Sequence, residues 1–82
     1  MTGGGLEPAA VCDGGALDCG AGLLIAIRRA LSTIAVGDIL EIRSEADSVA
    51  TDLPAWCDIV GHRLEQVTRT GTTTNYFVRK GR

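Results

Sequence analysis

An apolar stripe with helical spacing, set between two strand-like segments, constrains the fold of this chain more than any other feature. The stripe lies on one face of a helix predicted over residues 21–33 and comprises Leu23, Ile27, Ala30, Leu31 and Ile34. A weakly strand-like segment, residues 9–13, precedes the helix and ends at two glycines, and residues 39–44 predict a second strand after a Gly-Asp turn. Strand, helix and strand over this length predict a βαβ unit with parallel strands and a right-handed crossover.

A second helix is predicted to end near Val60. Its core-facing stripe has the spacing of one helix face and comprises Leu53, Trp56, Cys57 and Val60. Because proline is tolerated only in the opening turn of a helix, Pro54 indicates that the regular helix starts close to Asp52, which then acts as its N-cap. Gly61 is suited to end this helix in a left-handed conformation.

The rest of the chain predicts a hairpin. Residues 62–69 and 73–80 form its strands, and the opposite parity of Leu64 and Val67 predicts a bulge or a strand with both faces partly covered. The predicted fold is therefore an α/β two-layer sandwich of order β-α-β-α-β-β, with a mixed four-stranded sheet and both helices on one face. Residues 1–8 are expected to form a flexible N-terminal arm, followed by a single domain at residues 9–82.

The composition limits which cellular compartment and which kinds of partner are expected for this chain. The net charge of −2 argues against nucleic acid as the main partner, although the eight basic residues allow a local basic patch. The apolar run at residues 23–27 is far shorter than the roughly 20 residues of a membrane span, and no secretory signal is visible. The three cysteines are an odd number without a CxxC pair, which argues against a disulfide framework and a zinc ribbon and indicates a reducing, cytoplasmic compartment.

Cys19 is the candidate functional residue. It lies where a Gly-rich segment passes into the predicted helix, and backbone N–H groups at a helix start have no partner within the helix. An anion is stabilised there, and a thiolate so placed can have a pKa well below the free value of about 8.5. The backbone of Gly20, Ala21 and Gly22 is expected to stabilise an anion such as the Cys19 thiolate. Asp18, which would raise the pKa of the thiol, is expected to face solvent or to temper its reactivity.

The remaining candidate residues have structural interpretations. Cys57 lies on the apolar stripe of the second helix and Cys12 in or beside the first strand, so both are expected to be packed thiols. His62 is expected to form a hydrogen bond near a helix end rather than to act in catalysis.

Two features bear on protein contacts. The strand end at Arg79 and Lys80 is expected to be solvated, or else to contact an acidic partner surface. Strand alternation places Ile39 and Phe77 on the sheet face away from the helices. If both are exposed, they form an apolar surface that a partner protein or a second copy of the chain would cover, the latter as a weak homodimer.

Several segments, in order and at matching spacings, resemble the TusA/SirA-like family of sulfur-carrier proteins over about residues 11–80. They are Asp13, Ala16-Leu17 and Cys19 for the opening D-x-x-G-L-x-C-P-x-P motif, residues 36–42 for the GxxLEV strand entry, residues 52–57 for the DIPxFC helix, residues 61–64 after it, and residues 76–80 for the closing strand with its RK end.

The resemblance implies a fold and an activity. Members of the family have the β-α-β-α-β-β sandwich, and their cysteine carries a persulfide taken from a cysteine desulfurase and passes the sulfur to another protein. By this resemblance Cys19 would be the persulfide carrier, with a sulfur-donor protein and an acceptor protein as partners. No cofactor and no metal are implied.

The sequence departs from the family at the motif itself. Cys19-Gly20-Ala21-Gly22 stands where the family has C-P-x-P, and Ala16 stands where it has glycine. Proline fixes φ near −65° and has no N–H, so the two glycines are expected to loosen the first helical turn and to add two N–H groups beside the sulfur. Such donors can form an anion-binding nest.

Two alternatives stay open. The altered motif allows a binding or regulatory module that keeps the fold and has lost sulfur transfer. Small α/β sandwiches of this kind also occur as RNA-binding domains of translation initiation factors. A sulfur-transfer assay with a cysteine desulfurase tests the first alternative, and a salt-sensitive RNA complex would indicate the second.

Overall fold

The computed structural model describes residues 7–17, 20 and 22–82. Its elements follow in the order β1 (Pro8–Gly15), α1 (Leu23–Leu31), β2 (Ile39–Ser44), α2 (Val49–Val60), β3 (Arg63–Thr70) and β4 (Thr73–Arg79). The predicted N-terminal arm lies outside the described residues except for Glu7 and Pro8, and Pro8 already pairs with Ile39 in the sheet.

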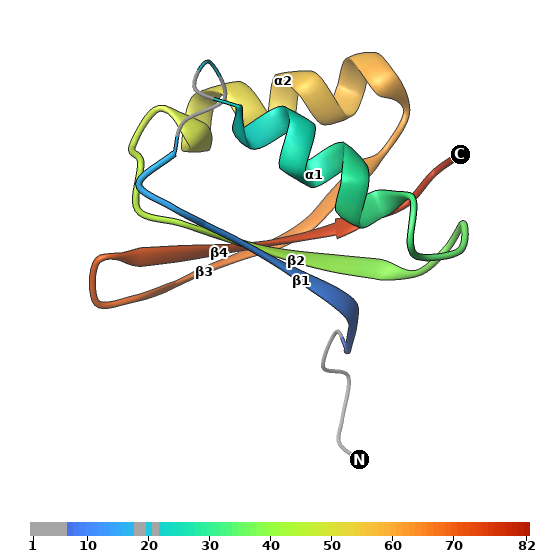
Figure 1. Ribbon diagram of the computed structural model, residues 1–82, viewed down its shortest axis with the longest axis horizontal. Helices are drawn as coiled ribbons and strands as arrows, with labels where there is room; N and C mark the ends of the chain where they lie inside the picture. The colour runs from blue at the N-terminus through green and yellow to red at the C-terminus, as the bar shows by residue number, and fades with distance from the viewer. Residues whose placement is uncertain (1–6, 18–19, 21) are drawn as a thin grey trace.

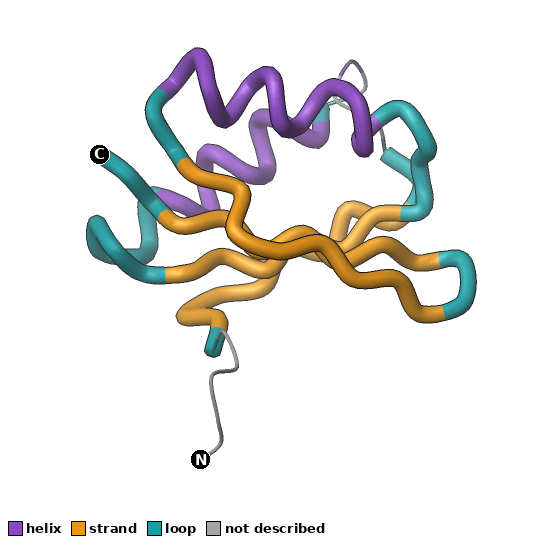
Figure 2. Tube along the Cα trace, turned by 180° about the vertical axis from the view of Figure 1, so that it is seen from behind, coloured by secondary structure: helices purple, strands orange, loops and turns teal. Residues whose placement is uncertain are grey.

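The four strands form one mixed sheet in the order β1-β2-β4-β3. β1 pairs parallel with β2, as the predicted βαβ unit requires, whereas β4 pairs antiparallel with both β2 and β3. Both helices lie on one face of the sheet, and the tip of the β3–β4 hairpin extends beyond them (Figure 1 and Figure 2). The predicted two-layer α/β sandwich and its element order are therefore confirmed.

The core lies between the helices and the inner face of the sheet. Alternation along the central strands sends matched pairs of side chains inward, Leu40 with Val78 and Ile42 with Tyr76. The buried cluster comprises Cys12, Leu23, Ile27, Leu31, Ile34, Leu40, Ile42, Val49, Leu53, Cys57, Tyr76 and Val78. Neither described helix has the length and apolar character that crossing a bilayer would need.

Helix α2 starts earlier than predicted, at Val49, so the predicted start close to Asp52 is wrong. Asp52 lies in the first turn, where its N–H donates to the Ser48 carbonyl at 3.0 Å, and it is not the N-cap. Pro54 is accommodated inside the helix on an exposed side. The extra turn forms because Val49, four residues before Leu53, is wholly buried, and burying a valine side chain contributes about 1.5–3 kcal/mol.

The other boundaries differ by small amounts. α1 is shorter than predicted by two residues at each end, and β1 continues through both glycines to Gly15. Gly61 ends α2 at φ +87°, and its N–H and that of His62 both donate to the Cys57 carbonyl at 2.9 Å, which confirms the predicted left-handed cap. The predicted bulge in β3 is confirmed by a shift of register between Leu64 and Gln66.

The outer face of the sheet does not meet the condition set for a homodimer, which was that two apolar side chains on this face are both exposed. Ile39 is only 5% exposed and Phe77 is half-buried, so the expectation of an exposed apolar pair fails for Ile39. Arg79 lies opposite Ile39 in the sheet and forms an ion pair with Glu65 at 2.8 Å. Long polar side chains that are paired in this way cover apolar surface with their stems.

Candidate functional site

The end of β1 and the start of α1 are packed directly against each other. Gly14 is buried, and a Cβ atom there would lie 2.5 Å from Cδ1 of Leu23 and 3.2 Å from the Arg43 carbonyl oxygen. Only glycine leaves room for Leu23, the first residue of α1, which is fully buried at this point. The start of the helix is therefore held against the end of the strand.

Backbone hydrogen bonds hold the connection at its β1 side. The Leu17 N–H donates to the Gly14 carbonyl at 2.9 Å, and the Glu45 N–H, just after β2, donates to the Gly15 carbonyl at 2.7 Å. The Asp13 carboxylate accepts the Gly15 N–H at 3.2 Å. The chain thus leaves the sheet at a defined place, next to the end of β2.

The start of α1 has an uncommon geometry. Gly22 is the N-cap residue at φ +103°, ψ +2°, and its carbonyl accepts the Ala26 N–H at 3.2 Å. Among the described residues no side chain caps the helix, and its first turn has no acidic residue. The positive end of the helix dipole is therefore not offset by an acidic side chain in that turn.

The left-handed Gly22 corrects one expectation. The helix starts at Leu23, so Gly22 precedes the first helical turn, and the expectation that it loosens this turn from within does not apply to it. A proline, with φ fixed near −65°, cannot adopt the observed conformation. A chain with the C-P-x-P motif could therefore not have the backbone conformation observed at Gly22.

The predicted site residues are only partly described. Asp18, Cys19 and Ala21 lie outside the described residues, while Gly20 is exposed and Leu17 is 45% exposed. Within the described ranges, no group of three or more His, Cys, Asp or Glu residues is placed to hold a metal ion.

Cys12 and Cys57 are both buried in the core. Cys12, on β1 opposite Ile42, is 8% exposed, and burial raises the pKa of its thiol, which the Asp13 carboxylate raises further. Cys12 is therefore a neutral thiol near pH 7 and a poor nucleophile. Cys57 is 2% exposed on α2, in agreement with the packed role predicted for it.

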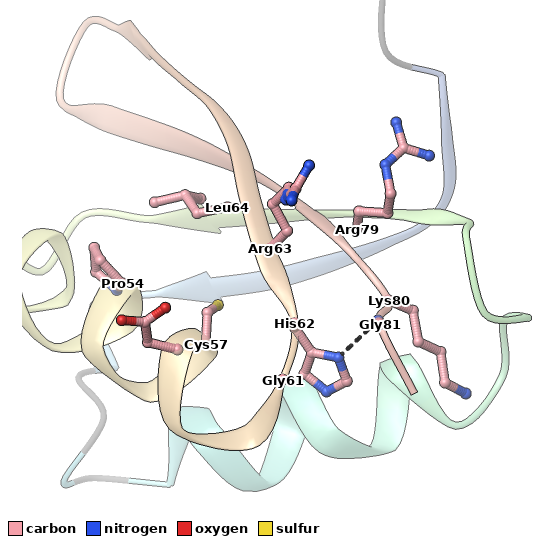
Figure 3. A pocket seen from close by; sticks show the side chains of 10 residues that line it. Pro54, Cys57, Gly61, His62, Arg63, Leu64, Arg79, Lys80 and Gly81 are labelled. Carbon is pink, nitrogen blue, oxygen red and sulfur yellow. Dashed lines mark hydrogen bonds between the residues drawn. The ribbon is translucent and has the colours of Figure 1, made fainter.

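A hollow of about 770 Å³ lies at the other end of the helix layer (Figure 3). It is formed where α2 ends, β3 begins and β4 ends, far from the start of α1 (Figure 1). Its lining comprises Pro54, Cys57, Asp58, Gly61, His62, Arg63, Leu64, Arg79, Lys80 and Gly81.

His62 forms the predicted hydrogen bond near a helix end. Its Nδ1 accepts the Gly81 N–H at 3.1 Å (Figure 3). Its ring lies 5.7 Å from that of Trp56. Burial lowers the pKa of His62, and the positive charges of Lys80 and Arg82 lower it further. The imidazole is therefore neutral near pH 7.

The expectation of a solvated strand end at Arg79 and Lys80 is wrong. Nζ of Lys80 donates to the carbonyls of Leu31 and Ile34, both at 2.8 Å, and so satisfies the C-terminal end of α1. Arg79 pairs with Glu65 and donates to the Gly37 carbonyl at 2.7 Å. These partners lie 14 to 49 residues away in the sequence, so no local pattern indicates them.

Comparison with known proteins agrees with this architecture. The family model described as "Sulfurtransferase TusA" matches residues 22–80, a span that begins just after Cys19. The sulfur carrier protein TusA of Pseudomonas putida (strain GB-1) is 29% identical over 73 residues, which cover 89% of this chain and 90% of that protein. Since the family match extends over well more than half of the sequence and over every element from α1 to β4, the chain belongs to the TusA family.

Proposed function

We propose that this protein is a small sulfur carrier in which Cys19 accepts sulfur as a persulfide and passes it to another protein. Membership of the TusA family is the observation that carries the proposal. The relative named as a sulfur carrier aligns with nearly the whole chain, which gives it further support.

The proposed chemistry is two consecutive exchanges of one sulfur atom. The Cys19 thiolate attacks the terminal sulfur of a donor persulfide, so a new S–S bond forms while the donor's own S–S bond breaks and the donor leaves as a thiolate. A thiolate of the acceptor then attacks the terminal sulfur on Cys19 and regenerates the Cys19 thiolate. No electrons are gained or lost overall, so no cofactor is required.

The properties of Cys12 and Cys57 support Cys19 as the reacting cysteine. Cys12 and Cys57 are buried, and the pKa of Cys12 is raised. Cys19 lies in the connection between Gly15 and Leu23, whose described members Leu17 and Gly20 are exposed. The first turn of α1, which follows, lacks an acidic side chain that would oppose a thiolate.

The proposed partners are a persulfide-bearing donor, such as a cysteine desulfurase, and an acceptor protein with a reactive thiol, both in the cytoplasm. The large hollow lies at the end of the helix layer opposite to the start of α1 (Figure 1). Selectivity therefore has to come from protein docking around the connection rather than from a pocket that encloses a small substrate.

Transfer of labelled sulfur tests the proposal. The protein is incubated with a cysteine desulfurase and ³⁵S-cysteine, beside the variants Cys19→Ser, Cys12→Ser and Cys57→Ser. We expect label released by dithiothreitol on the natural protein and on the Cys12 and Cys57 variants, and none on Cys19→Ser. Equal labelling of Cys19→Ser, or no labelling of the natural protein by desulfurases that load other family members, would overturn the proposal in favour of a module that has lost sulfur transfer.

A further inference from the structure

A second, smaller hollow lies beside the C-terminal end of α1, and its lining is basic. It measures about 230 Å³ and is lined by Arg28, Leu31, Ser32, His62, Lys80 and Arg82. Three segments that are distant in the sequence meet here: the last turn of α1, the residue after the α2 cap, and the segment after β4. None of its lining residues is acidic.

Hydrogen-bond donors remain available at this hollow. Because Nδ1 of His62 accepts the Gly81 N–H, the neutral imidazole carries its proton on Nε2, which is then a donor (Figure 3). The Lys80 ammonium has three N–H groups, of which two are used by the Leu31 and Ile34 carbonyls. Arg28 and Arg82 are exposed, and each guanidinium has five N–H donors.

The two backbone carbonyls that contact Lys80 already have a charged donor. Lys80 binds the last carbonyls of α1, so the negative end of the helix dipole is offset by a fixed ammonium group. The ion pairs among the described residues, Arg43–Glu41 and Arg79–Glu65, use neither Arg28 nor Arg82.

The side chain of Arg82 lies against the backbone of the α2 cap. A Cβ atom on Gly61 would lie 2.8 Å from Cδ of Arg82, so the side-chain stem of Arg82 runs directly over this glycine. Gly81 approaches the Gly61 carbonyl too closely for any side chain of its own, and its N–H is bonded to His62. The Arg82 stem and the Gly81 N–H therefore both lie against the segment that follows α2.

We propose that this basic hollow binds a small dianionic oxyanion: inorganic phosphate or sulfate, or the terminal phosphate of a larger molecule. Arg28 and Arg82 supply guanidinium donors, which match the geometry of tetrahedral oxyanions. His62 Nε2 and the remaining Lys80 N–H complete the set. The site is independent of the sulfur chemistry at Cys19.

The electrostatics of His62 agree with a positive potential in the hollow. Beyond the effect of burial, Lys80 and Arg82 lower the pKa of His62. A bound dianion would oppose these charges and raise that pKa, which gives the proposal a second, independent readout.

Titration with inorganic phosphate, followed by ¹⁵N NMR at constant ionic strength and pH 7, tests the proposal. Saturable shifts are expected at the amides of Ser32, His62 and Gly81. The double variant Arg28→Gln/Arg82→Gln should bind about tenfold more weakly, the loss expected for one charge-assisted hydrogen bond. Arg69→Gln, which changes an exposed arginine of the β3–β4 hairpin, should leave the affinity within about twofold.

Titrations with other ligands distinguish a free oxyanion from the phosphate group of a larger molecule. Equal affinity for phosphate and sulfate indicates a free oxyanion, whereas markedly tighter binding of adenosine monophosphate indicates the phosphate of a larger molecule. The pKa of His62 should rise with phosphate in the natural protein and not in the double variant. Shifts that do not saturate, or an equal loss of affinity in Arg69→Gln, would overturn the proposal as general charge screening.

Discussion

The two ends of the helix layer are held in contrasting ways. At the start of α1, glycines and backbone hydrogen bonds set the geometry, and within the part of the chain that the structure describes no side chain caps the helix. At the opposite end, side chains of Lys80, Arg79 and His62 reach across the fold to satisfy carbonyl and N–H groups. The comparison teaches that, among the described residues, the start of α1 depends on backbone geometry, whereas long-range side-chain contacts secure the opposite end of the helix layer.

The largest effect on stability is expected from Lys80→Met. This change leaves the Leu31 and Ile34 carbonyls without their charged donor, and we expect a loss of about 2–3 kcal/mol in the free energy of unfolding. Denaturation in urea measures it. Arg79→Met removes the neighbouring, more exposed ion pair and should cost at most about 1 kcal/mol. Equal effects of the two variants would contradict the role given to Lys80.

Gly14→Ala tests the packing at the other end. The added methyl group would collide with Leu23, so we expect a loss of about 2 kcal/mol. In the double variant Gly14→Ala/Leu23→Val the smaller side chain relieves the collision, and part of this loss should be recovered relative to the sum of the single changes. Strictly additive free energies of unfolding would show that the two residues do not constrain each other.

His62 predicts a pH dependence with a definite sign. Its pKa in the folded protein lies below the ordinary value of 6.5, so the unfolded chain binds more protons, and stability is fully present above about pH 6.5 and declines as the pH falls below it. The chain has one histidine, so His62→Asn removes the titration while an amide oxygen can still accept the Gly81 N–H. The free energy of unfolding, measured between pH 7.5 and pH 5.5, should fall less in the variant. A steeper fall in the variant would reverse the assigned sign.

The smallest effect concerns the proposed backbone stabilisation of the Cys19 thiolate by Gly20, Ala21 and Gly22. Gly20→Pro removes the N–H of the residue that follows Cys19 in the sequence, and we expect the Cys19 pKa, measured from alkylation rates against pH, to rise by about half a unit. Gly22 is unsuitable for this test because its φ of +103° excludes proline. An unchanged or lower pKa in Gly20→Pro would show that this amide does not stabilise the thiolate.

The sequence predicts well what depends on periodicity. The stripe of Leu23, Ile27 and Leu31, the β2 boundaries and the cap at Gly61 follow from local patterns that the structure confirms. The start of α2 could not be predicted this way, because the buried Val49 lies within a polar segment and outweighs the signal of Pro54.

Properties that depend on tertiary contact are not visible in the sequence. The two carbonyls that bind Lys80 lie 46 and 49 residues away along the chain. The burial of Ile39 depends on the side chains of the neighbouring strands, among them Arg79, which lies opposite Ile39. At the candidate site the family motif identifies Cys19. The motif could not predict the left-handed backbone of Gly22, because the family has a proline at that position.

Peptide-resolved mass spectrometry after incubation with a cysteine desulfurase and cysteine tests the central claim most directly. The account predicts a gain of about 32 Da, one sulfur atom, on the peptide that contains Cys19, lost on reduction, with Cys12 and Cys57 unmodified. A persulfide found on Cys12 or Cys57 while Cys19 stays unmodified would contradict it.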